Sequence, residues 1–121
     1  MYEIEFYCDV SGNEPVVEYI RGLIASTDKD HRIKLKKIRE YFNVLANYGT
    51  RAGIPYVKHI RGDVWELRPT SDRIFFFFWR DNKFVMLHHY KKQTQQTPER
   101  EIQQAERNLA DWLNRKGARK L

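Results

Sequence analysis

Charged, imidazole and phenolic side chains gather in the middle of the sequence, between residues 58 and 92. The basic members are Lys58, Arg61, Arg68, Arg73, Arg80, Lys83, Lys91 and Lys92, and the acidic members are Asp63, Glu66, Asp72 and Asp81. His88, His89 and Tyr90 add groups that accept or donate protons. This combination of residue types suits acid–base chemistry on an anionic substrate.

Strand periodicity sorts these side chains onto faces, because successive residues of a strand point to opposite sides of a sheet. In residues 64–68, Trp65 and Leu67 are typical of a core, so we expect Glu66 and Arg68 to point outward or into a cleft. In residues 84–91, His88 and Tyr90 share one face. His89 and Lys91 share the other face.

Cleavage of RNA requires such a set of groups. A base removes the 2′-OH proton, an acid protonates the leaving 5′-oxygen, and preplaced cations stabilise the extra negative charge on the phosphate. No metal is needed for this reaction. A solvated sheet face, in which Arg68 pairs with Glu66 and His88 is an ordinary edge residue, explains the same spacing and stays open.

Other chemistries are excluded by what the sequence lacks. The histidines are not spaced as metal ligands, and no glycine-rich phosphate loop is present, so we expect no metal and no cofactor. Cys8 is the single cysteine, which excludes a disulfide framework. The longest apolar run, residues 74–79, is too short to cross a bilayer, and residues 1–10 have no export-signal pattern. We therefore expect a cytoplasmic protein with no membrane partner.

The elements that must position these residues follow from the periodicity. Residues 2–7 suit a strand, and residues 15–26 suit a helix with Asn13 as N-cap. The break at residues 26–30 supplies a cap for a second helix, which ends near Gly49. Four strands are predicted at residues 55–60, 64–68, 73–80 and 84–91, with residues 74–79 buried on both faces. Thr97 is the N-cap candidate of a last helix, and Pro98 suits its first helical position.

This order predicts one α+β domain over residues 1–121, with a two-helix hairpin packed on an antiparallel sheet and a basic, frayed tail from Arg115. The formal net charge of +6 favours an anionic partner such as nucleic acid. The second helix also carries basic residues, which suit either a phosphate backbone or an ordinary solvated face: Arg32, Lys34, Lys36, Lys37 and Arg39.

Five segments together resemble a known family. They are Asn13-Glu-Pro-Val, Gly49-Thr-Arg-Ala-Gly, Val64-Trp-Glu-Leu-Arg-Pro, Asp72-Arg-Ile and Leu87-His-His-Tyr-Lys-Lys-Gln-Thr-Gln-Gln-Thr-Pro. The sequence is similar, over about residues 2–114, to the HigB-like, phage-derived branch of the RelE/ParE toxin superfamily. The resemblance implies a twisted antiparallel sheet, and a type II toxin that enters the ribosomal A site and cuts mRNA. It also implies a helix-turn-helix antitoxin of the HigA type as partner.

The resemblance also implies roles for individual residues. The basic catalytic positions of the family correspond to Arg68 and Arg73, and its last-strand histidine corresponds to His88. His89 follows at a more variable position, and Tyr90 stands where the family has an aromatic residue, often Phe. Lys91 and Lys92 match a basic pair before Thr94.

These observations combine into one hypothesis with open assignments. Either Glu66 or a neutral His88 is the base, and either His88 or Tyr90 is the acid. Arg68 and Arg73 hold the scissile phosphate. Four further residues bind flanking RNA: Lys58, Lys91, Lys92 and His89. Two other functions remain open, namely a ParE-like gyrase poison that acts by protein binding and a non-catalytic RNA-binding module.

Overall fold

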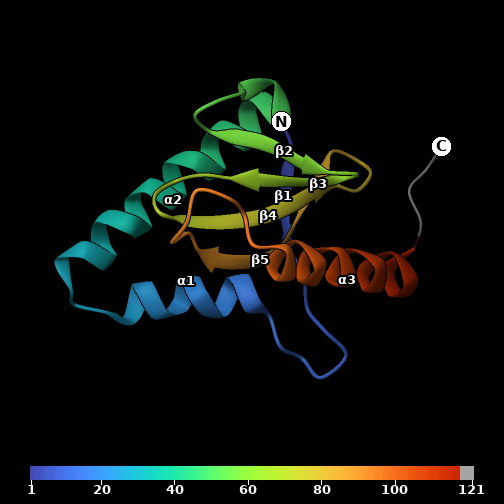
Figure 1. Ribbon diagram of the computed structural model, residues 1–121, viewed down its shortest axis with the longest axis horizontal. Coiled ribbons are helices and arrows are strands. Elements are labelled where there is room, and N and C mark those ends of the chain that lie inside the picture. The colour runs from blue at the N-terminus through green and yellow to red at the C-terminus, as the bar shows by residue number, and fades with distance from the viewer. Residues whose placement is uncertain (118–121) are drawn as a thin grey trace.

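The computed structural model describes residues 1–117 of the chain (Figure 1). The elements in order are β1 (Glu3–Phe6), α1 (Pro15–Ala25), α2 (Lys29–Tyr48), the short 3-10 helix η1 (Gly49–Ala52), β2 (Val57–Arg61), β3 (Val64–Leu67), β4 (Asp72–Phe78), β5 (Lys83–Lys91) and α3 (Glu99–Lys116). The α+β class and the helical hairpin before the sheet are confirmed. The predicted frayed tail is helical as far as Lys116, and its last four residues lie outside the described part.

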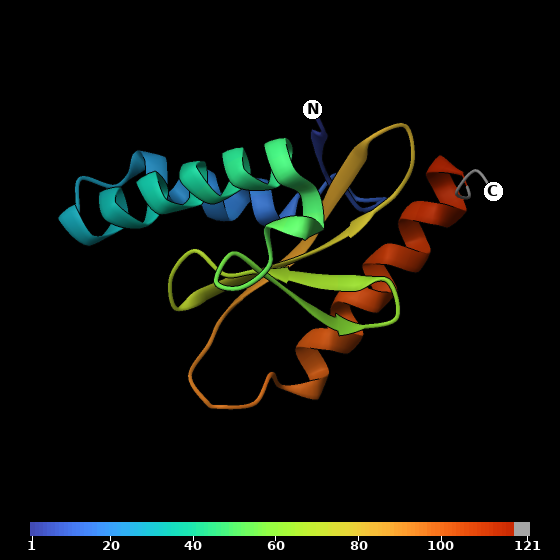
Figure 2. The same ribbon diagram turned by 90° about the horizontal axis from the view of Figure 1, so that it is seen from above.

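The elements form three layers. Figure 2 shows α1 and α2 together on one side of the sheet and α3 on the other. One apolar cluster joins Val16 of α1 and Ile38 of α2 to Phe76 of β4. Two others join the opposite sheet face to Ala105 and Trp112 of α3. We call these two sides the hairpin face and the α3 face.

The five strands lie in the order β1-β5-β4-β3-β2. The pairs from β2 to β5 are antiparallel, as predicted, and they are joined by short turns. β1 differs from the prediction, because it pairs parallel to β5 and makes the sheet mixed. A parallel pair needs a long connection, and the chain between β1 and β5 runs through both hairpin helices and the other three strands.

β4 is the middle strand, and its side chains are the centre of the core. Ile74, Phe75, Phe76 and Phe77 have no exposed surface, as the unbroken apolar run predicts. Phe78 is the exception at 39% exposed. Alternate residues of this run enter opposite layers, so β4 is anchored to the hairpin and to α3 at once.

A β-bulge in β5 sets which side chains reach the α3 face. Phe75 lies opposite His88, and Phe76 lies opposite Met86, so Leu87 is one extra residue in β5. The side chain of Asn108 on α3 donates from Nδ2 to the carbonyl oxygen of Leu87 at 2.8 Å. This bond gives the carbonyl of the extra residue a partner inside the core.

The helix starts differ from the prediction at two of three places. Asp28 caps α2 by accepting from the backbone N–H of Asp30, within the break that was expected to supply a cap. Asn13 is not the N-cap of α1, because Glu14 holds that place and the amide of Asn13 donates to Asp9 instead. Pro98, not Thr97, stands at the N-cap of α3. Proline fits there because its missing N–H needs no partner at a helix start.

Candidate functional site

Glu66 lies at the centre of the candidate site and is buried. It stands on β3 opposite Phe75 of β4, and only 1% of its side chain is exposed. The prediction that Glu66 points outward or into a cleft is wrong, because α3 covers the face of the sheet on which Glu66 lies. An unpaired buried carboxylate is costly, so its partners decide what the site can do.

Three side chains surround this carboxylate. The hydroxyl of Tyr90 donates to Glu66 Oε2 at 3.0 Å. The Nε atoms of Arg68 and Arg73 each lie 3.5 Å from Oε1. We call these four residues the Glu66 cluster. Arg73 is further held through Nη1, which donates to the backbone carbonyl oxygen of Thr70.

The two arginines of the Glu66 cluster reach the surface. The exposed fraction of the side chain is 23% for Arg68 and 12% for Arg73. Together with Lys92 they line an open depression of about 550 Å³, which we call the basic depression. Its rim is completed by Gln93, Thr94 and Gln95. Three cations around one opening suit a phosphate group, which arginine recognises through paired N–H groups.

Tyr90 lies between the basic depression and a neighbouring one. It lines a second depression of about 500 Å³ together with Lys91, Thr97 and Glu101. Burial and the negative charge of Glu66 raise the pKa of Tyr90 to about 12, although the bond with Thr97 acts in the opposite direction. Tyr90 therefore keeps its proton at neutral pH and is a donor.

The raised pKa of Tyr90 has a measurable consequence for stability. Because the folded state holds this proton more tightly than the unfolded state, the free energy of unfolding is full below pH 10 and falls as the pH rises towards 12. A shift of this size corresponds to a loss of up to about 2–3 kcal/mol. Urea denaturation of wild type and Tyr90→Phe between pH 9 and 12 measures it. We expect the free energy of unfolding to fall more steeply with pH in wild type than in Tyr90→Phe. Parallel pH curves for the two proteins would contradict the raised pKa.

His88 is on the same face as the Glu66 cluster but is held by α3. Its Nε2 lies 2.7 Å from Oε1 of Glu101. Its ring stacks at 6.3 Å on Phe75, whose other neighbour is the ring of Tyr90 at 5.2 Å. Sequence reasoning missed Glu101, because an acidic residue in the first turn of a helix is already explained by the helix dipole.

His89 faces the hairpin instead. Its ring stacks on Tyr19 of α1 with centroids 4.0 Å apart and 17° between the planes. Burial, and then the neighbouring His88, lower the pKa of His89, so it is neutral at pH 7. The hydroxyl of Tyr19 donates to Asp72, a buried carboxylate that also pairs with Lys34 at 3.1 Å. The structure therefore does not bring His89 to the Glu66 cluster.

The remaining predicted residues are placed around these groups. Lys58 is exposed on the edge strand β2 and lies opposite Glu66 in register. Lys91 is exposed at the end of β5 and lies opposite Asp72. Lys92 is half-buried, and its backbone N–H donates to Ser71. Of the predicted lysines, the structure brings Lys92 into contact with the basic depression that Arg68 and Arg73 line.

Two other kinds of feature, a metal site and a membrane-spanning helix, are not formed by residues 1–117. No group of three or more His, Cys, Asp or Glu side chains in this part of the chain is arranged to hold a metal ion. Within the same residues, no helix combines the length and the apolar character needed to span a membrane.

Comparison with known proteins identifies one family. The family described as "Phage derived protein Gp49-like (DUF891)" matches residues 24–110. The match runs from the end of α1 through all of α2, the four antiparallel strands and most of α3. It includes the whole Glu66 cluster and both histidines of β5. No curated protein matched the sequence.

Proposed function

Because the chain belongs to the phage-derived Gp49-like family, which is a family of RelE/HigB-type toxins, we propose that it is the toxin of a type II toxin–antitoxin pair and cleaves mRNA on the ribosome. A toxin of this family has an antitoxin partner. In the proposal that antitoxin is a helix-turn-helix protein of the HigA type. The toxin acts at the ribosomal A site in the cytoplasm.

The observation that carries this proposal is the Glu66 cluster, whose two arginines line the basic depression. Arg68, Arg73 and Lys92 bind the scissile phosphate and stabilise the charge that develops on its oxygens. Glu66 acts through the two arginines, because its carboxylate holds both Nε atoms and is itself closed off from solvent. We therefore assign Glu66 a positioning role.

His88 is the base in this scheme. Its side chain is 18% exposed, against 1% for Glu66, so the 2′-OH of a bound nucleotide has better access to it. When Nε2–H donates to Glu101, the neutral ring has its lone pair on Nδ1. Glu101 therefore orients the imidazole as a carboxylate orients the histidine of a catalytic triad. The deprotonated 2′-oxygen then attacks the phosphorus.

Tyr90 is the acid in this scheme. Its raised pKa keeps the phenol protonated, and its depression adjoins the basic depression, because Gln93 and Thr94 line both. The phenol gives its proton to the 5′-oxygen as the bond from phosphorus to that oxygen breaks. The products are a 2′,3′-cyclic phosphate and a free 5′-hydroxyl. Lys58, Lys91 and His89 are assigned to flanking RNA.

A reconstituted translation system tests the proposal. A reporter mRNA is incubated with the protein, with and without ribosomes, and cuts are mapped by primer extension. We expect cuts inside the translated frame, and only where ribosomes are present. Intact mRNA together with DNA damage in expressing cells would favour a gyrase poison. Salt-sensitive RNA binding without cuts would favour a binding module.

A further inference from the structure

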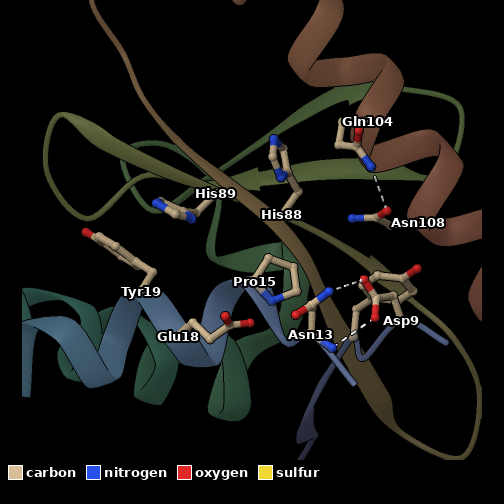
Figure 3. Close-up of a pocket in the computed structure, with 10 residues that line it drawn as sticks. Asp9, Asn13, Pro15, Glu18, Tyr19, His88, His89, Gln104 and Asn108 are labelled. Carbon is tan, nitrogen blue, oxygen red and sulfur yellow. Dashed lines mark hydrogen bonds between the residues drawn. The ribbon is translucent and has the colours of Figure 1, made fainter. Parts of the chain in front are cut away.

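A further depression lies along the edge of β5 and shares His88 and His89 with the scheme above. It has a volume of about 470 Å³ and lies between α1 and α3 (Figure 3). β1 pairs with residues 83–86, and within the described part of the chain no strand covers the remaining half of β5. The depression lies along that uncovered half, and both His88 and His89 line it.

One wall of this depression is flat and largely apolar. The stacked rings of Tyr19 and His89 form part of it, and the ring of Pro15 lies beside them, as Figure 3 shows. Nδ1 of His89 is buried and has no hydrogen-bond partner in residues 1–117. The hydroxyl of Tyr19 is fixed by Asp72 in the core, so the ring platform is preformed.

Hydrogen-bond acceptors held in place by the protein lie at the α1 end of the depression, near Pro15 and Tyr19. The carboxylate of Glu18 accepts from the backbone N–H of Glu14 through Oε2, which leaves Oε1 as a further acceptor. The amide of Asn13 is tied through Nδ2 to Asp9 at 3.1 Å, so its oxygen is the group left to accept. The amide of Gln104 is engaged at both ends, because Nε2 donates to Asn108 at 2.9 Å and the oxygen accepts from Arg107 at 2.7 Å.

The local charge disfavours a phosphate here. Asp9 and Glu18 both line the depression, and hydrogen bonds from Asn13 lower the pKa of Asp9, so it is ionised at neutral pH. Like charges would repel an anionic group. A neutral, flat ligand that carries hydrogen-bond donors matches both the ring platform and the acceptors.

We propose that this depression binds one nucleobase with an exocyclic amino group, from a nucleotide next to the scissile phosphate. The base stacks against the Tyr19–His89 platform, and its amino group donates to Glu18 and Asn13. Stacking of single-stranded bases on aromatic side chains is the usual basis of RNA recognition, and carboxylates accept from such amino groups. The inference deepens the proposed function and rests on it, because the base is taken to belong to the cleaved strand.

The spacing of residues along β5 is consistent with an RNA strand that runs from the basic depression to this depression. His88 lines the depression, and Tyr90, two residues along the strand, lies opposite Arg73. Two residues of a strand span about 6.6 Å, which is comparable with one nucleotide step of an extended single strand. A nucleotide can therefore leave its phosphate in the basic depression and turn its base past His88.

Binding of nucleosides to the whole protein tests the inference without requiring cleavage. The probes are two matched pairs, adenosine against inosine and cytidine against uridine, in which an amino group is replaced by a carbonyl oxygen. Binding is followed by NMR, through the backbone amides of Tyr19 and His89 and the imidazole nitrogens of His89. We expect adenosine and cytidine to bind at least threefold more tightly than inosine and uridine.

Two variants localise the effect. Glu18→Gln removes the charged acceptor, and we expect it to abolish most of the difference within each pair. Glu14→Gln removes the same charge from the same end of α1, outside the depression, and should keep the difference. Equal affinity within both pairs, or resonance shifts confined to Arg68, Arg73 and Lys92, would overturn the proposal. This experiment measures binding and not cleavage, so its outcome is independent of the outcome of the nuclease assay.

Discussion

Replacement of Arg73 by alanine is expected to lower the rate of ribosome-dependent mRNA cleavage by roughly 100- to 1000-fold, the usual cost of removing one preorganised group that stabilises a transition-state charge. Arg73 is held by Glu66 and by the carbonyl oxygen of Thr70, so its guanidinium is already in place before substrate arrives. The measurement is the rate of cutting at one mapped site, followed by primer extension under single-turnover conditions.

Two controls separate a chemical effect from a folding defect. Arg21→Ala removes one positive charge from the exposed surface of α1, away from the Glu66 cluster, and should cut at the wild-type rate. Circular dichroism of Arg73→Ala should show the wild-type helix content. Arg73→Lys retains the charge but not the paired N–H groups, and should recover only part of the rate. A loss below about threefold in Arg73→Ala would remove this residue from the transition state.

Replacement of Phe75 by alanine is expected to cost about 3–5 kcal/mol of the free energy of unfolding, as for other fully buried phenylalanines. Phe75 has no exposed surface and stacks on both His88 and Tyr90. It also lies in register between Glu66 and His88. Domains of this size are stable by about 5–15 kcal/mol, so such a loss leaves little margin. Urea denaturation followed by tryptophan fluorescence measures it.

A second phenylalanine of the same strand is the matched control. Phe78 is 39% exposed, so Phe78→Ala should cost less than half as much as Phe75→Ala. Phe75→Leu keeps most of the volume and should fold, but it removes the ring on which the proposed base and acid both rest. We expect the loss of cleavage rate, expressed as a free energy, to exceed the loss of free energy of unfolding. A loss below about 1.5 kcal/mol in Phe75→Ala would mean that the core closes around the missing ring.

Local patterns in the sequence predict most of the fold. The unbroken apolar run from Ile74 predicts the buried middle strand, and short polar turns predict its antiparallel neighbours. The pairing of β1 was not predictable in the same way. A parallel pair is decided by the packing of the intervening helices, and no local feature of residues 3–6 indicates its direction.

The candidate site is predicted in part for a similar reason. Alternation correctly places His88 and Tyr90 on one face of β5. Alternation cannot say which layer covers that face, and α3 covers it, so Glu66 is buried rather than open to solvent. The bond from Glu101 to His88 depends on the same docking of α3. Asp72 is similar, because the sequence around it explains it as a turn residue. Its bond to Tyr19 joins elements far apart in the chain and could not be predicted from that local sequence.

The extra residue in β5 interrupts the alternation of side chains between the two faces of the sheet, so residues after Leu87 are shifted by one position relative to a regular strand. Val85 and Leu87 both face α3, and His88 follows Leu87 onto the same face because of the bulge. Straightening the strand at constant length would send the imidazole of His88 to the hairpin layer. Deleting Leu87 would keep it where it is. The number of residues in β5, and not only their identity, therefore encodes which layer receives the histidine, and relatives with a shorter strand must be aligned with a gap at this point.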